Sequence, residues 1–189
     1  MIKRIVKYNQ QGMVIPISFV YQRSEYDNVS QKEALEYINC YSKESFSWVF
    51  ENIQIILNDE FVSIKAYPSI CQNYIVAIYQ GKDGAFPQPN NAVIYNLNGS
   101  IHKVLEIPKL ISPRLLEQIE KNNESNPPLE AVKYDNDLGF LSFGWDKDKE
   151  GILFNYISIQ YHRDYGEGRE LNVERGEIGR LIEDWYNYY

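Results

Sequence analysis

The sequence predicts an α+β fold, in which an antiparallel β meander is flanked by two or three short helices. Three observations support this fold class. Short β-rich runs fill residues 46–108, a helix-capping pattern precedes residues 31–41, and apolar residues recur at helical spacing near the C-terminus. With 189 residues, the chain has the length of a single domain. The polar segment 122–128 is the one place where a sub-division is expected.

Local signals predict the N-terminal elements. Residues 13–21, MVIPISFVY, are predicted to form a strand, and Pro16 places this strand at a sheet edge or a bulge. A capping box of Ser30 and Glu33 predicts a helix over residues 31–41, because apolar residues recur there at positions i, i+3, i+4 and i+7.

Residues 46–57, FSWVFENIQIIL, fit two structures. Their β-branched and aromatic content favours strands, but their apolar spacing also suits a helix, so both readings stay open. The two runs that follow, at 61–67 and 74–80, are predicted strands.

The most regular pattern lies in residues 90–108, NNAVIYNLNGSIHKVLEIP, and predicts a β-hairpin. With Asn98-Gly99 as a two-residue type I′ turn, Tyr95 would lie opposite His102. Beyond the hairpin, Ser112 as N-cap and Pro113 at the first helical position predict a short helix. Its apolar face would consist of Leu115, Leu116 and Ile119.

The C-terminal third is predicted to return to strands and then to end in a helix. A charged, solvated loop is expected at 161–170, and a closing amphipathic helix from Ile178 to Tyr189. The strands are expected at 129–134, 139–145 and 152–161.

Composition and charge exclude several classes of function. A net charge of −7 argues against direct binding of nucleic acid and suits a partner with a basic surface. No run of apolar residues is long enough to span a membrane. Cys40 and Cys71 lack metal-type spacing and are expected to be reduced, and the N-terminus lacks the apolar core of an export signal. These features together predict a cytoplasmic protein.

The sequence contains few of the patterns that catalysis requires. The chain contains two histidines, no nucleophile elbow and no glycine-rich phosphate loop after a strand. Asp146 to Gly151, DKDKEG, resembles the start of a calcium loop, but Ile157 stands at the twelfth position, where a bidentate Glu is needed. A charged hairpin turn is therefore predicted there. We expect no catalytic residues, no metal ligands and no cofactor.

A protein-binding surface is the remaining prediction. Strand filling accounts for most of the sixteen tyrosines, and a surface cluster would remain for recognition, since Tyr and Arg supply many of the anchor residues of protein interfaces. The charged segment 161–170 is the candidate recognition loop. The predicted contact residues are Tyr161, Arg163, Asp164, Tyr165 and Arg169, with Asp146 and Asp148 as acidic neighbours.

Two segments, NAVIYNLNGSIHKVLEIP at 91–108 and ERGEIGRLIEDWY at 174–186, resemble small bacterial proteins of the toxin-immunity kind. That resemblance implies a non-enzymatic, cytosolic protein that neutralises a cognate toxin by stoichiometric occlusion, with an acidic surface set against a basic toxin. Two alternatives stay open. One is a hydrolase that acts on a glycan or small molecule through paired carboxylates. The other is a structural subunit of a larger complex.

Overall fold

The computed structural model describes residues 2, 4–18, 21, 26, 28–40, 43–125 and 138–187. Within these residues the chain forms twelve strands and two helices. The strands make three separate antiparallel sheets of four strands each. The predicted α+β class, a single meander flanked by helices, is therefore wrong, and the fold is mostly β.

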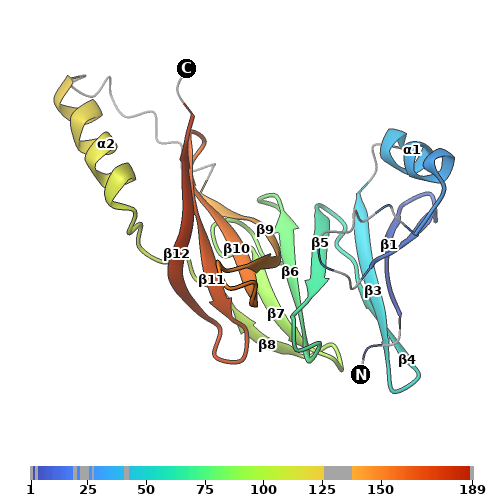
Figure 1. Cartoon of the computed structure of the whole chain (residues 1–189). Coiled ribbons are helices and arrows are strands. Elements are labelled where there is room, and N and C mark those ends of the chain that lie inside the picture. The colour runs from blue at the N-terminus through green and yellow to red at the C-terminus, as the bar shows by residue number, and fades with distance from the viewer. Residues whose placement is uncertain are drawn as a thin grey trace.

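The three sheets stand in a row, with the central sheet between the other two (Figure 1). The N-terminal sheet has the order β2 (Val14–Pro16), β1 (Ile5–Asn9), β3 (Glu44–Phe50), β4 (Ile53–Leu57). The central sheet has the order β5 (Ser63–Pro68), β6 (Tyr74–Gln80), β7 (Ala92–Asn96), β8 (Ile101–Val104). The C-terminal sheet has the order β12 (Glu177–Tyr186), β11 (Tyr165–Asn172), β10 (Leu153–His162), β9 (Gly139–Lys147).

Both faces of the central sheet are buried, which explains why β6 and β7 read as continuous apolar runs. Alternate side chains of a strand point to opposite faces, so each strand serves two cores. The core shared with the N-terminal sheet includes Ile75, Ala77, Val93, Phe46 and Trp48. The core shared with the C-terminal sheet includes Val76, Ile78, Ile94, Phe140 and Ile157.

Buried polar groups tie the layers together. The Asn91 amide donates to the carbonyls of Tyr79 (2.8 Å) and Phe140 (3.0 Å), and its oxygen accepts from the N–H of Phe140 (2.8 Å). On the other side of the central sheet, Trp48 Nε1 donates to the Leu97 carbonyl at 2.7 Å. Since buried polar groups cost free energy when unpaired, these bonds favour one alignment of the sheets.

The structure confirms most predictions for the first half of the chain. Helix α1 (Gln31–Asn39) begins at the Ser30–Glu33 capping box. Residues 46–57 form strands, because β3 and β4 pair across a two-residue turn at Glu51 and Asn52. Of the strand predicted at 13–21, only Val14–Pro16 forms one, the edge strand β2, and the neighbouring strand β1 was not predicted.

The predicted register of the β7–β8 hairpin is confirmed at its open end, where Val93 pairs with Val104 as expected, but the predicted pair of Tyr95 and His102 is wrong. Tyr95 lies opposite Ile101, and His102 instead lies against the ring of Tyr74, with ring centroids 4.9 Å apart. The turn has three residues, since Asn96 and Ser100 close it and Gly99 has a φ of +86°. The three-residue turn sets the pairing near it one residue off the predicted one, and an irregularity between Ile94 and Tyr95 restores the predicted register further along the strands.

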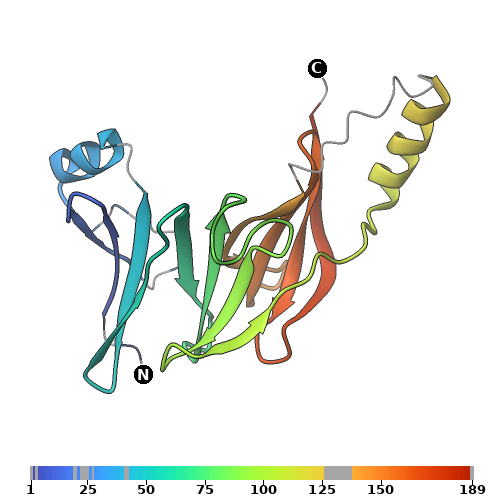
Figure 2. The same cartoon turned by 180° about the vertical axis from the view of Figure 1, so that it is seen from behind.

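Helix α2 (Pro113–Ser125) starts where predicted and leaves the body of the molecule beside β12 (Figures 1 and 2). Ser112 caps it, because the Leu115 N–H donates to Ser112 Oγ at 3.2 Å. Of the predicted apolar face, Leu115 is fully buried and Leu116 is 48% exposed. The strand predicted at 129–134 lies outside the described residues.

Two predictions for the C-terminal third are wrong. Residues 161–170 are not a loop, because β10 and β11 run through them and leave only a tight turn at Arg163 and Asp164. Residues 177–186 are not a helix but the edge strand β12, which pairs with β11. Predicted strands at 139–145 and 152–161 are confirmed as β9 and β10.

Candidate functional site on the C-terminal sheet

All seven predicted contact residues belong to the C-terminal sheet or its turns, but six of them lie at two opposite ends of it, and Arg169 lies between, opposite Ile157. Asp146 on β9 pairs with Phe154, and Tyr165 on β11 pairs with His162. Eight residues of β10 separate these two pairs, which corresponds to about 26 Å along the strand. One end carries Asp146 and Asp148, and the other carries Tyr161, Arg163, Asp164 and Tyr165.

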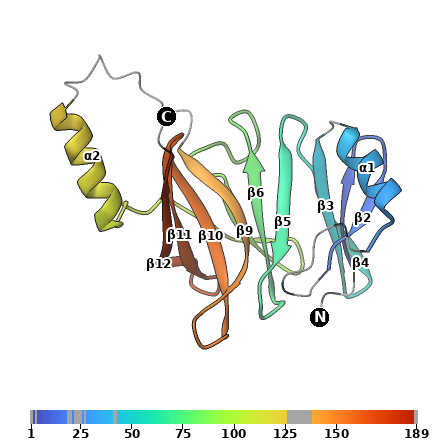
Figure 3. The ribbon, with the colours of Figure 1, turned by 45° about the horizontal axis from the view of Figure 1, so that its top comes forward.

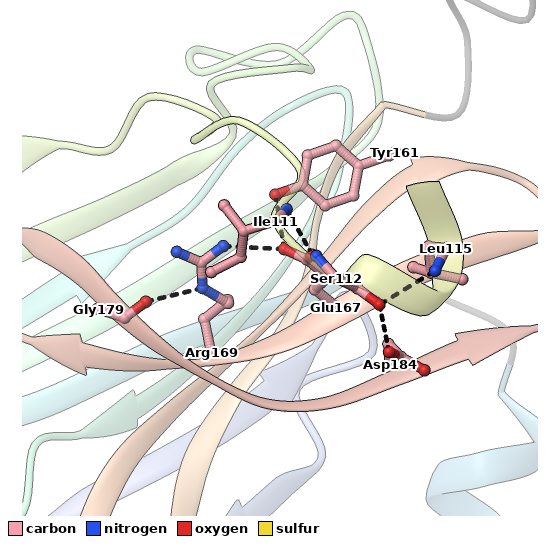
Figure 4. Close-up of polar contacts among 8 residues, drawn as sticks. All are labelled: Ile111, Ser112, Leu115, Tyr161, Glu167, Arg169, Gly179 and Asp184. Carbon is pink, nitrogen blue, oxygen red and sulfur yellow. Dashed lines mark hydrogen bonds and ion pairs between the residues drawn. The ribbon is translucent and has the colours of Figure 1, made fainter. Parts of the chain in front are cut away.

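Two of the predicted contact residues, Tyr161 and Arg169, point inward and meet at Glu167 (Figure 4). Glu167 is fully buried, and Arg169 is only 5% exposed. Oε2 of Glu167 accepts from Arg169 Nη1 at 2.8 Å and from the Tyr161 hydroxyl at 3.2 Å. Oε1 accepts from the backbone N–H groups of Ile111 (2.8 Å) and Ser112 (2.6 Å).

This buried carboxylate has a structural role. Four donors converge on Glu167, so its negative charge is compensated without water. Burial, followed by the charge and hydrogen bond of Glu167, raises the pKa of Tyr161, so this hydroxyl stays protonated and donates. The bonds to Ile111 and Ser112 fix the segment that leads into α2 against the sheet.

A second carboxylate, Asp184 on β12, holds the first turn of α2. It accepts hydrogen bonds from the Ser112 hydroxyl and from Arg114, whose Nε lies 2.6 Å from Oδ1. Burial alone would raise the pKa of Asp184. The hydrogen bonds from Ser112 and Arg114 have the larger effect, and the net result is a pKa below the ordinary Asp value. The start of α2 is therefore attached to the sheet at two carboxylates.

At the turn between β10 and β11, three rings form a stack across three strands. The rings of His162 and Tyr165 lie 5.3 Å apart, and those of Tyr165 and Tyr186 lie 6.0 Å apart and nearly parallel. Nδ1 of His162 lies 3.2 Å from Oδ2 of Asp164. The neighbouring Arg163 side chain is 53% exposed. The turn therefore brings the Arg163 guanidinium, the Asp164 carboxylate and the three stacked rings together.

We call the face of the C-terminal sheet that points away from the central sheet the open face. It carries a second group of aromatic side chains. It comprises Phe154, Tyr156, Glu170, Arg180, Glu183 and Trp185. Tyr156 donates to Glu183 at 2.7 Å, and Arg180 Nε lies 2.7 Å from Glu170. The Arg180 guanidinium also lies over the Phe154 ring, 5.3 Å from its centroid. Burial and then the bond to Glu183 raise the pKa of Tyr156.

Two glycines make room for the aromatic rings of the open face. A Cβ on Gly166 would lie 2.1 Å from the Trp185 ring and 2.3 Å from the Ile159 carbonyl oxygen. A Cβ on Gly168 would lie 2.3 Å from the Tyr156 hydroxyl. At such distances a side chain at either position would have to displace the ring or the strand, so glycine is what lets Trp185 and Tyr156 take these positions.

The remaining predicted residues lie at the far end of the open face. The Tyr21 hydroxyl donates to Asp146 at 3.1 Å. Asp148 accepts from the backbone N–H groups of Glu150 and Ile152 and closes the β9–β10 turn, as the predicted charged hairpin requires. A shallow groove of about 410 Å³ lies between this turn and β12, lined in part by Asp148, Phe154 and Arg180.

The sequence patterns did not indicate that Glu167, Tyr156 and Trp185 contribute to this site. A signal for Glu167 was present, since Glu167, Arg169 and Leu171 alternate with small or solvent-facing residues and so share one strand face. Among the residues that the structure describes, no group of three His, Cys, Asp or Glu side chains could hold a metal ion. The described segments also contain no helix with the length and apolar character needed to cross a membrane.

No family model matches this chain, and no curated protein or solved structure is significantly similar to it.

Proposed function

We propose that this protein is a non-enzymatic binding protein whose open face engages a protein partner. The observation that carries the proposal is the exposed sheet face on which Tyr156 and Trp185 lie beside Arg180. Tyr, Trp and Arg are the side chains most enriched among interface residues that dominate binding energy. Sheet pairing, the glycines beneath the rings and the buried Glu167 on the opposite face hold these side chains in place, which lowers the entropy cost of binding.

The chemistry of the partner follows from charge. With a net charge of −7, the protein would attract a partner with a basic surface and accelerate their encounter. We propose that this partner is a toxin, which the bound protein occludes stoichiometrically, and that binding takes place in the cytosol. The free thiols of Cys40 and Cys71 suit a reducing compartment.

The alternative of a carboxylate-dependent hydrolase needs two carboxyl groups that face a substrate across a pocket. On the open face, the carboxylates of Glu170 and Glu183 are each held by a neighbouring side chain, Arg180 and Tyr156 respectively. These pairings stabilise a surface and give hydrolysis no specific support. Binding is therefore the function that the geometry favours.

A charge reversal tests the proposal. Tagged wild-type protein is used to capture partners from the source organism, and the captured protein is identified by mass spectrometry, purified and titrated. We expect Arg180→Glu to weaken this affinity at least tenfold. Lys32→Glu on α1, whose side chain is 84% exposed, is the matched control and should bind as the wild type does. Equal affinities for all three proteins would exclude the open face, and a wild type without a stoichiometric partner would exclude the binding function.

A further inference from the structure

A small apolar cavity lies where the three sheets meet. In Figure 3, β5 stands between β3 of the N-terminal sheet and β9 of the C-terminal sheet. The cavity has a volume of about 150 Å³, and its walls include Phe46 on β3, Ile64 and Ala66 on β5, and Phe143 on β9. An apolar cavity of about this size holds one benzene molecule, so the apolar part of an occupant is limited to a single ring.

Main-chain groups of β5 point toward this cavity. β5 is an edge strand, and its residue Ala66 lies opposite Ala77 of β6. The Tyr79 N–H donates to the Asn91 carbonyl, in the direction of β7, and Ala77 bonds in the same direction because it is two residues away. The N–H and C=O of Ala66 therefore point away from β6, to the open edge that the cavity borders.

These two groups of Ala66 place a donor beside an acceptor. In an antiparallel strand the N–H and C=O of one residue point the same way. Pro68, two residues further on, confirms the direction, since its carbonyl accepts from Trp145 Nε1 on β9 at 2.8 Å. Ile64 has the same orientation but is only 1% exposed, whereas Ala66 is partly exposed. Among the described residues β5 pairs with β6 alone, so neither group of Ala66 has a strand partner.

The charged side chains around the cavity favour a neutral occupant. Lys7 is 5% exposed, and its ammonium lies 3.3 Å from Glu44 Oε1 and donates to the Tyr26 hydroxyl at 3.1 Å. The two buried charges thus compensate each other. Lys65 also borders the cavity, but it is exposed and water screens its charge. An ionic ligand would lose its hydration without gaining a buried counter-charge.

We propose that this cavity binds a small neutral molecule in which a planar ring carries an amide, as a primary amide or as a ring lactam. Such a group places a C=O next to an N–H, so it can accept from the Ala66 N–H and donate to the Ala66 C=O. The ring would lie among the apolar walls, which include Phe46 and Phe143. Phe143 packs against the core between the C-terminal and central sheets, so this site is distinct from the open face.

Titration of the full chain with benzamide, followed by isothermal titration calorimetry, tests the site. We expect saturable binding of one molecule per chain, at least tenfold tighter than that of toluene or benzoate. Toluene fills the cavity without hydrogen bonds, and benzoate lacks the donor and carries a charge. Equal affinities for benzamide and toluene would overturn the pairing with Ala66, and tighter binding of benzoate would overturn the neutral class. A wild type that does not bind benzamide saturably overturns the proposal.

Variants at Ala66 locate the site. Ala66→Pro removes the N–H that points to the cavity but no bond to β6, and Pro68 shows that β5 accepts proline at an equivalent position. It should weaken benzamide binding at least tenfold and leave toluene binding unchanged. Gln54→Pro is the matched control and should bind benzamide as the wild type does. Gln54 lies opposite Val49, whose N–H bonds toward β1, so the Gln54 N–H also points to an open edge.

A cavity-filling variant gives an independent readout should the proline variant not fold. Ala66→Ile keeps both main-chain groups, suits a strand, and places a larger side chain beside the cavity. With unchanged circular dichroism, it should weaken the binding of benzamide and toluene alike, at least tenfold. Wild-type affinity for benzamide in a folded Ala66→Pro or Ala66→Ile variant would show that the ligand binds elsewhere and would overturn the proposal.

Discussion

Replacing Glu167 with Gln probes the buried network that supports the candidate site. The substitution keeps the shape of the side chain but removes its charge. The amide oxygen can still accept from the backbone N–H groups of Ile111 and Ser112. The amide nitrogen then faces the Arg169 guanidinium, which lay 2.8 Å from the carboxylate, and both groups are donors. A buried positive charge loses its compensating partner.

The expected cost follows from the burial of both groups. The side chains of Glu167 and Arg169 are 0% and 6% exposed, so solvent screens their interaction little. Removing one member of such a pair typically costs about 3–5 kcal/mol, since the other charge is left buried. For a chain of this length that loss corresponds to a melting temperature lower by about 6–20 °C.

Urea denaturation measures this cost, with the slope of the transition held as a check on two-state behaviour. The double variant Glu167→Gln, Arg169→Met removes both charges. It should be more stable than the sum of the two single variants predicts, because neither charge is then left unpaired. Glu183→Gln, an exposed carboxylate on the same sheet, is the control and should change stability by less than about 0.5 kcal/mol.

A loss below about 1 kcal/mol for Glu167→Gln, or strict additivity in the double variant, would refute this reasoning. Either result would mean that water or a local rearrangement compensates Arg169 in place of Glu167. The exposed pair of Arg180 and Glu170 shows the contrast, since surface ion pairs typically contribute about 0–1 kcal/mol.

Two further predictions concern other buried polar groups. Asn91→Leu should destabilise the chain by about 3–9 kcal/mol in urea denaturation, because it leaves three main-chain groups, the N–H and C=O of Phe140 and the C=O of Tyr79, without the Asn91 side chain, at about 1–3 kcal/mol for each group. Burial alone would raise the pKa of Asp59. Hydrogen bonds from three backbone N–H groups, those of Ala85, Phe61 and Val62, have the larger effect, so the pKa of Asp59 lies below the ordinary Asp value. A lowered folded-state pKa stabilises the protein above the ordinary Asp value of about 3.9, and this contribution is lost as the pH falls through the folded-state pKa. Asp59→Asn should therefore cost stability at pH 7, and the difference from the wild type should shrink below about pH 4.

The C-terminal strand shows why local spacing misleads. Ile178, Leu181, Ile182 and Trp185 recur at helical intervals. In the structure the β11–β12 ladder contains two register shifts, between Gly168 and Arg169 and between Arg169 and Leu171. Each bulge breaks the two-residue alternation of a strand. The resulting pattern in β12 matches that of a helix, and only the partner strand distinguishes the two.

The candidate site likewise could not be predicted from local sequence patterns alone. The mixed charges of residues 161–170 predicted a loop, and their glycines do not favour a strand in isolation. In the fold, Gly166 and Gly168 lie beneath Trp185 and Tyr156, and this contact makes the glycines necessary. The predicted contact residues lie on one sheet, but their division into buried and exposed side chains depends on which face meets the central sheet.

The sequence by itself determined the elements whose signals are local: the capping box of α1, Pro113 at the start of α2, and the Asp148 turn. These depend on hydrogen bonds and backbone angles within a few residues. Tertiary structure decided the division into three sheets, the strand β12 and the burial of Glu167. These depend on pairing and desolvation between segments far apart in the chain, and no short stretch of sequence contains both partners.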